Sequence, residues 1–169
     1  MEIEDFYGTR CAKRSGVPLM NHINEGTKLL EHLGASVECI RAYRIHPIYQ
    51  DALGERFIEL LQEEGPVIAF VVGYTQTANA SLSDIVFRDY SRDWHPLALK
   101  RPIVLSDIPE VNLMLVADKC QNYKDFIKYH YGTHVRSDEL DFYFSEWLKA
   151  LGVSDAQFNY YRELMSSGV

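Results

Sequence analysis

Two histidines and one aspartate are the residues of this chain best suited to hold a metal ion. They lie in three patches: GVPLMNH ending at His22, HPIYQD beginning at His46, and VADKCQN containing Asp118. Histidine nitrogens and carboxylate oxygens are the usual ligands of hydrolytic metal centres. A lone histidine is more often a hydrogen-bonding residue than a ligand, so the prediction depends on the three side chains converging. A helical bundle core is a common place for such a site.

Both histidines fall on or next to predicted helices in the first third of the chain. Apolar and small residues recur at helical spacing from about residue 21 to residue 33, and Gly34 follows where a helix C-cap belongs. Ser36 is suited to be the N-cap of a second helix that carries Tyr43. We expect Pro47 to disturb this second helix near His46, because the residue before a proline is biased away from the α region.

The rest of the chain predicts further helices, one of which carries Asp118. Helical spacing of apolar residues extends over residues 53–61, 110–128, 137–151 and 154–164. Ser137 or Asp138 is expected to cap the third of these helices. Ser154 and Gln157 form a capping-box pattern at the start of the fourth.

Two stretches are less regular in pattern. The apolar run 67–74 fits either a buried strand or a buried helix, and residues 78–108 are expected to form the most irregular part of the chain.

A length of 169 residues fits one domain with a sizeable core. The prediction is therefore a single all-α domain over residues 1–169, a bundle of about six helices with strands minor or absent.

Charge and composition argue against two classes of function. The formal net charge of −7 disfavours a nucleic-acid footprint, although a local basic pocket can still bind a small phosphorylated ligand. The sequence contains no run of about 18 apolar residues, so no membrane span is predicted. The three cysteines form no zinc pattern, and the N-terminus has no apolar signal region. A cytoplasmic protein is the simplest interpretation.

The order of the three patches resembles a known family. GVPLMNH is similar to a GTPYINH-like motif, and HPIYQD, which starts 24 residues after His22, is similar to HDxxED. FVVGYT at 70–75 is similar to LVxxVT, which favours a helix for the ambiguous apolar run, and VADKCQNYKDF at 116–126 aligns without a gap to LADKLxNLRDL. The pattern YFxxW follows at Tyr143. In this combination the chain resembles the HD-domain superfamily, and within it the RelA/SpoT-type alarmone hydrolases and their small stand-alone relatives.

The resemblance implies a metal centre and a substrate. His22, His46 and Asp118 would be the metal ligands. The cofactor would be a divalent metal: manganese first, with zinc or iron as alternatives, or no metal if the site has decayed. In the family the metal activates a water that cleaves pyrophosphate from the 3′ position of a guanosine alarmone. The partner would be a small phosphorylated nucleotide, with no nucleic acid and no membrane; the oligomeric state stays open.

The same resemblance assigns roles to four further residues. Asn122 would face the nucleotide or support the ligand shell. Asp51 would take the place of the last acid of HDxxED, and Gln50 would stand where the family has its catalytic glutamate. Arg14, with Arg10 and Lys13, precedes GVPLMNH, and the family has a basic stretch near there that contacts the guanine and the phosphates.

Three departures from the family pattern weaken the case for chemistry. Pro47 replaces the aspartate that names the HD domain, so one ligand is lost. Gln50 is nearly isosteric with glutamate but cannot act as a base. Asn112 and Leu115 stand where the family has lysines. Metal affinity and rate are both expected to be lower than in the family.

Two hypotheses therefore stand side by side. The first is an HD-type metal-dependent phosphohydrolase acting on a nucleotide or an alarmone-like pyrophosphate. The second is a catalytically inactive HD-fold protein that binds a ligand or partner in the old pocket. A third alternative is that the motifs are coincidence in an unrelated helical domain. That alternative predicts that His22, His46 and Asp118 do not point into one cavity.

Overall fold

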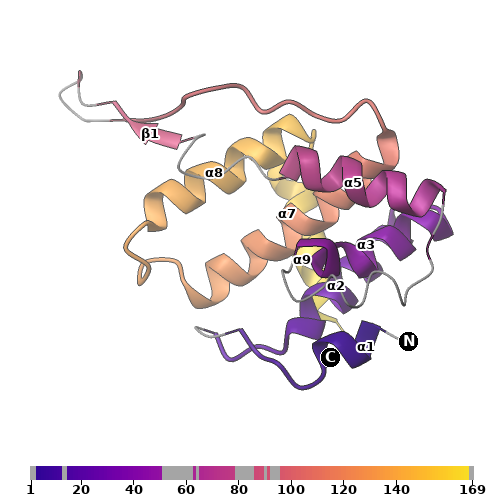
Figure 1. The fold of residues 1–169 in the computed structure, drawn as a ribbon. Helices are drawn as coiled ribbons and strands as arrows, with labels where there is room; N and C mark the ends of the chain where they lie inside the picture. The colour runs from indigo at the N-terminus through magenta and orange to yellow at the C-terminus, as the bar shows by residue number, and fades with distance from the viewer. Residues whose placement is uncertain are drawn as a thin grey trace.

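The computed structural model describes residues 3–12, 15–50, 63, 65–78, 86–89, 91 and 96–167 (Figure 1). Within them lie seven helices and two short strands. The elements are α1 Ile3–Tyr7, α2 Leu19–His32, α3 Val37–Gln50, α5 Pro66–Ala78, β1 Val86–Arg88, β2 Leu97–Leu99, α7 Pro109–Tyr129, α8 Ser137–Ala150 and α9 Asp155–Ser166. The predicted all-α class is confirmed. The predicted helix at 53–61, Asp51 and Arg14 lie outside the described residues.

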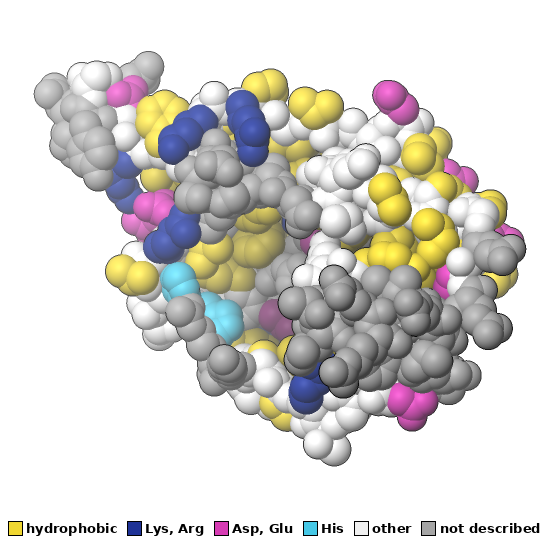
Figure 2. All heavy atoms as spheres, in the orientation of Figure 1, with side chains coloured by type: hydrophobic (Ala, Val, Ile, Leu, Met, Phe, Trp, Pro, Cys, Tyr) yellow, Lys and Arg dark blue, Asp and Glu magenta, His cyan; other side chains and the backbone are white. Residues whose placement is uncertain are grey.

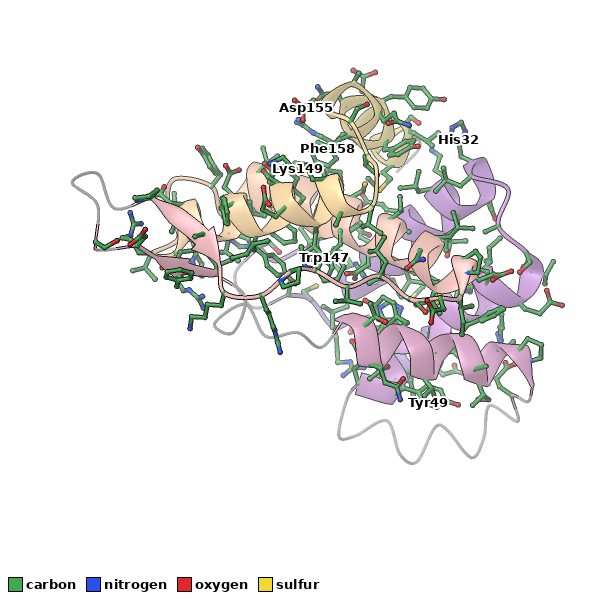
Figure 3. All side chains as sticks on the ribbon, turned by 90° about the horizontal axis from the view of Figure 1, so that it is seen from above. His32, Tyr49, Trp147, Lys149, Asp155 and Phe158 are labelled. Carbon is green, nitrogen blue, oxygen red and sulfur yellow. The ribbon has the colours of Figure 1, made fainter. Side chains whose placement is uncertain are left out.

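The long helix α7 forms the centre of the bundle. It packs against α2, α3, α5, α8 and α9. Its buried residues lie all around the helix, as expected of a helix with neighbours on several sides. Trp147 of α8 is 1% exposed and points toward the interior, whereas Lys149, two residues later, lies on the outer side (Figure 3). Asp118 and its neighbours on α7 are therefore held by packing from both sides.

The turns that set the directions of α2, α3 and α9 follow the predicted capping. Gly34 adopts φ +71° after α2, a conformation that favours glycine. The hydroxyl of Ser36 accepts a hydrogen bond from the Cys39 N–H at 3.1 Å and caps α3. The capping box of Ser154 and Gln157 is present at α9. These turns fix how α2 and α3 face each other.

Two details of the predicted helices differ. Neither Ser137 nor Asp138 caps α8, because its N-cap residue is Arg136, without a side-chain cap. The Ser137 hydroxyl instead accepts from the N–H of Gly132, at 3.0 Å, and so closes the preceding turn. The ambiguous run 67–74 is helical, within α5. The stretch 78–108 includes the antiparallel pair β1–β2, with Phe87 opposite Ala98.

Pro47 does not end the second helix, so the predicted disturbance near His46 is wrong. α3 continues through the proline to Gln50. Proline has no N–H, so the carbonyl four residues earlier, that of Tyr43, lacks its usual helical donor. In the structure this carbonyl accepts from His46 Nδ1 at 2.5 Å. A side chain thus replaces the missing backbone donor, and the helix tolerates the proline.

Among the described residues, no helix is both long enough and apolar enough to cross a membrane.

Candidate metal centre

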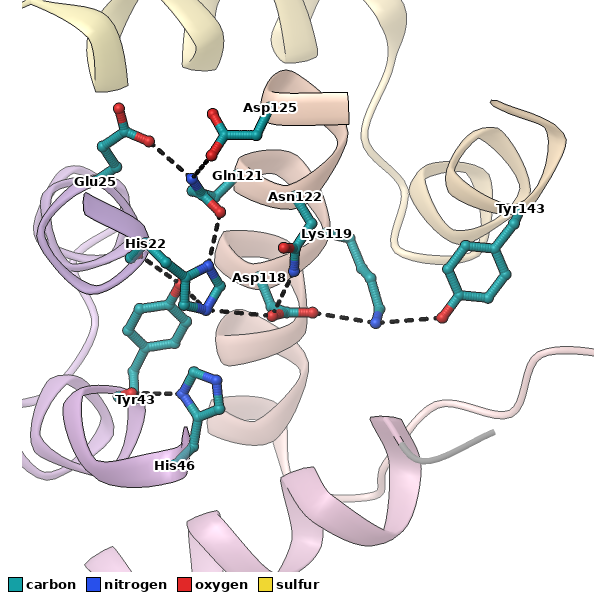
Figure 4. Close-up of polar contacts among 10 residues, drawn as sticks. All are labelled: His22, Glu25, Tyr43, His46, Asp118, Lys119, Gln121, Asn122, Asp125 and Tyr143. Carbon is teal, nitrogen blue, oxygen red and sulfur yellow. Dashed lines mark hydrogen bonds and ion pairs between the residues drawn. The ribbon is translucent and has the colours of Figure 1, made fainter. Parts of the chain in front are cut away.

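The three predicted ligands converge, one from each of α2, α3 and α7 (Figure 4). One nitrogen of His22, one nitrogen of His46 and a carboxylate oxygen of Asp118 all lie within 4.8 Å of one another. His22 Nε2 is 3.6 Å from Asp118 Oδ1, and the two imidazole rings meet edge to face with centroids 5.4 Å apart. All three residues line one cavity. The convergence expected from the sequence is therefore present.

A buried amide fixes the tautomer of His22. Gln121 donates through Nε2 to Glu25 Oε2 at 2.9 Å and to Asp125 Oδ2 at 2.8 Å. Its Oε1 must then face His22 Nδ1, at 2.6 Å, and an amide oxygen can only accept. His22 therefore carries its proton on Nδ1, which leaves the lone pair of Nε2 on the side of Asp118.

An ion-pair network holds this amide in place. Lys124 Nζ lies 2.8 Å from Glu25 Oε1 and 2.9 Å from Asp125 Oδ1. Burial opposes the charge on Lys124, but the hydrogen bonds that the ammonium donates to Glu25 and Asp125 outweigh burial and raise the pKa of Lys124. Glu25, Gln121 and Lys124 are all buried. Removing one member would leave an unpaired charge in the interior.

His46 is held in the matching tautomer and stays neutral. A carbonyl oxygen can only accept, so the 2.5 Å contact with Tyr43 O places the proton on Nδ1 and leaves the Nε2 lone pair free. Burial, followed by the neighbouring His22, lowers the pKa of His46 to about 3. Neutral imidazole is the form that binds metal ions.

Asp118 supplies the negative charge. Burial acts to raise its pKa, but Lys119, followed by the two histidines, outweighs burial and lowers the pKa to about 2. Asn122 Nδ2 donates to Oδ1 at 2.9 Å, and Lys119 Nζ lies 3.1 Å from Oδ2. Two histidine nitrogens and one carboxylate oxygen are a donor set that suits divalent manganese, iron or zinc, so the residues present fit the metal that the family resemblance implies.

A buried tyrosine closes the inner side of the centre. The hydroxyl of Tyr43 donates to the backbone carbonyl of His22 at 3.2 Å and lies 3.4 Å from His22 Nε2. Gly26 leaves room for this hydroxyl, because a Cβ at that position would overlap it. The ring of Tyr74 lies 4.6 Å from that of His46. The aromatic wall keeps water away from this side of the two imidazoles.

The other side of the centre opens into a cavity of about 430 Å³. Its lining includes the predicted residues Gln50 and Asn122 and, with them, Pro47 and Arg10. Figure 2 shows that one face of the molecule is hollowed, with hydrophobic side chains deep in the hollow and Lys and Arg side chains on part of its rim. A cavity of this size accommodates a ligand as large as a nucleotide.

Comparison of the chain with protein-family models, with curated proteins and with solved structures gave no match. The resemblance to the HD-domain alarmone hydrolases therefore stays a prediction from the sequence. The chemistry of the site rests on the geometry of its own residues.

Some residues singled out in the sequence lie elsewhere or are engaged otherwise. Arg10 Nη2 donates to the carbonyl of Phe6 at 2.6 Å, and its guanidinium covers the Phe6 ring. Asn112 is paired twice with the backbone of Ser106, and Leu115 is fully buried in the core. The two positions where the family has lysines therefore do not line this cavity.

The residues that orient the ligands were not predicted from the sequence. Gln121 lies one helical turn after Asp118 on α7, and Glu25 lies one turn after His22 on α2. Residues three apart on a helix share a face, so this spacing was the available signal. Lys124, three residues after Gln121, continues the same face.

Proposed function

We propose that this protein is an HD-type metal-dependent phosphohydrolase that acts on a nucleotide or an alarmone-like pyrophosphate. The observation that carries the proposal is the convergence of His22, His46 and Asp118 beside a cavity. Both imidazoles use Nδ1 for a hydrogen bond to the protein, which leaves Nε2 as the nitrogen that can bind a metal, and the carboxylate is ionised. Three such donors leave further coordination positions open, which is typical of a catalytic rather than a structural metal site.

The three ligands would hold a divalent metal, with manganese as the first candidate and zinc or iron as alternatives. Such a metal supplies two effects when bound: it lowers the pKa of a bound water, and it neutralises charge on a phosphate. The protein's own residues keep the donors in place. Asn122 fixes the Oδ1 atom of Asp118, and Gln121 fixes the ring of His22.

The cavity supports a substrate with an apolar part and a phosphate part. Phe6, Tyr7 and Leu19 offer apolar surface for a base or sugar. The same lining contains the metal ligands, beside which the phosphate would be cleaved. Gln50, also in this lining, can donate or accept a hydrogen bond but cannot take up a proton. We therefore expect slow turnover, because loss of a general base typically costs about 10²–10⁴-fold in rate.

A second function, ligand binding without catalysis, is favoured by two observations. Pro47 and Gln50 both line the cavity, so neither position brings an acid to it. The carboxylate of Asp118 already has a cationic partner, Lys119, at 3.1 Å. A protein that keeps the pocket but has lost the chemistry would bind a nucleotide and release it unchanged.

A hydrolysis assay distinguishes the two functions. The protein is incubated with manganese and a panel of nucleotides that includes guanosine 3′,5′-bis-diphosphate, and released phosphate and pyrophosphate are measured. Asp118→Asn is the matched control, since it keeps the shape of the side chain and removes its charge. Manganese-dependent release that is lost in Asp118→Asn supports the hydrolase. Binding without release of any product contradicts it and supports the second function.

A further inference from the structure

The carbonyl oxygen of Tyr43 has an unusual hydrogen-bond donor for a residue inside a helix. In a regular helix it would accept a hydrogen bond from the backbone N–H of residue 47. Residue 47 is a proline, which has no N–H and whose ring also crowds the carbonyl four residues earlier. The carbonyl accepts instead from the side chain of His46, at 2.5 Å.

His46 needs this acceptor. The residue is 2% exposed, and its ring is enclosed by Tyr43, Tyr74 and His22. Its protonated ring nitrogen cannot reach bulk water, and a buried donor without an acceptor is costly. A backbone N–H at residue 47 would compete for the same carbonyl and would draw it into the regular helical direction.

We propose that Pro47 is a positioning residue: by freeing the Tyr43 carbonyl, it fixes His46 as the Nδ1–H tautomer, with Nε2 bare toward His22 and Asp118. The role of this tautomer in catalysis rests on the proposed metal centre, but the tautomer itself does not depend on a bound metal. Pro47 stands where the family has an aspartate, so it removes one carboxylate from the site, but it orients His46, one of the remaining ligands. Gln121 performs the same task for His22 from another helix.

The first test reads the tautomer directly in metal-free protein. Long-range ¹⁵N–¹H NMR spectra at a pH where imidazole is neutral distinguish the Nδ1–H form from the Nε2–H form. The wild type should show His46 in the Nδ1–H form, and Pro47→Ala should populate the Nε2–H form. Pro109→Ala is the matched control, because Pro109 is the first residue of α7, where an N–H has no intrahelical acceptor. An unchanged tautomer in Pro47→Ala overturns the inference.

The second test measures metal affinity and thermal unfolding of the same variants. Pro47→Ala should bind manganese or zinc about 10-fold or more weakly, as is typical when a group that orients a ligand is lost. Its unfolding midpoint should not fall, since alanine suits a helix interior better than proline. This combination separates positioning from a general loss of structure.

The two proposals fail in different ways. A wild type that binds no metal contradicts the proposed function, while the NMR spectra still decide the role of Pro47. A wild type that binds metal, together with equal affinity in Pro47→Ala, overturns the positioning role and leaves the metal centre intact.

Discussion

His46 should make the fold sensitive to mild acid in the absence of metal. Burial lowers its pKa to about 3, from an ordinary value of 6.5. Between these two values the unfolded chain binds a proton on this ring and the folded chain does not. Stability therefore rises with pH across this window and is lost as the pH falls below about 6.5.

The size of the effect follows from the shift. Each pH unit below 6.5 favours the unfolded state by about 1.4 kcal/mol. At pH 5, one and a half units lower, the loss amounts to about 2 kcal/mol, a large part of the stability of a small domain. Between pH 7 and pH 5 Asp118 adds almost nothing, because its pKa of about 2 and its ordinary value of 3.8 both lie below pH 5. Among the described residues, the charged or titratable groups that face His46 are His22, Asp118, Lys119, Tyr43 and Tyr74; burial raises the pKa of both tyrosines, so they stay neutral at these pH values.

The assay is urea unfolding with a chelator present, at about pH 7, 6 and 5, for the wild type and His46→Asn. The asparagine amide does not titrate and can still donate to the Tyr43 carbonyl. The free energy of unfolding should fall about 2 kcal/mol more in the wild type than in the variant between pH 7 and pH 5. Parallel pH profiles would refute the reasoning, because they would mean that His46 is protonated in the fold or exposed to water.

Three further predictions follow from the same geometry. Gly26→Ala should lower the free energy of unfolding by about 1–3 kcal/mol, because the new methyl group overlaps the buried Tyr43 hydroxyl; denaturant unfolding measures this. Lys124→Met should cost about 3 kcal/mol in the same assay, since it leaves the buried Glu25 without its ion pair, and an unchanged midpoint would contradict the network. Gln50→Glu should raise the rate of manganese-dependent hydrolysis about 10²-fold or more, because it returns a base to the cavity. Equal rates would show that position 50 is not the place from which a general base acts.

The helices could be predicted from the sequence because their signals are local. Gly34, Ser36 and the capping box at Ser154 each act within one turn of the chain, and all three are confirmed. The apolar run in α5 could not be assigned from periodicity alone, because buried helices and buried strands are both apolar on every side. The prediction that Ser137 or Asp138 caps α8 was wrong, because the Ser137 hydroxyl accepts a hydrogen bond from Gly132 in the preceding turn.

The candidate site was predictable in its ligands but not in their surroundings. His22, His46 and Asp118 were identified by residue type and order, which chemistry constrains. Gln121 could not be assigned a partner, because its contact with His22 depends on how α2 and α7 are rotated against each other. Pro47 was misjudged, because its effect on α3 depends on a side chain that replaces the missing donor, and backbone preferences alone do not include this contact.

The most direct test of the metal centre is the metal content of the purified protein. The protein is prepared without chelators, dialysed against manganese and then against metal-free buffer, and analysed for bound metals beside Asp118→Asn. The proposed function predicts one divalent metal ion per wild-type chain and none in the variant, because Asp118 is the one carboxylate of the three ligands. A wild type without bound metal, or a variant that retains as much as the wild type, would contradict the account.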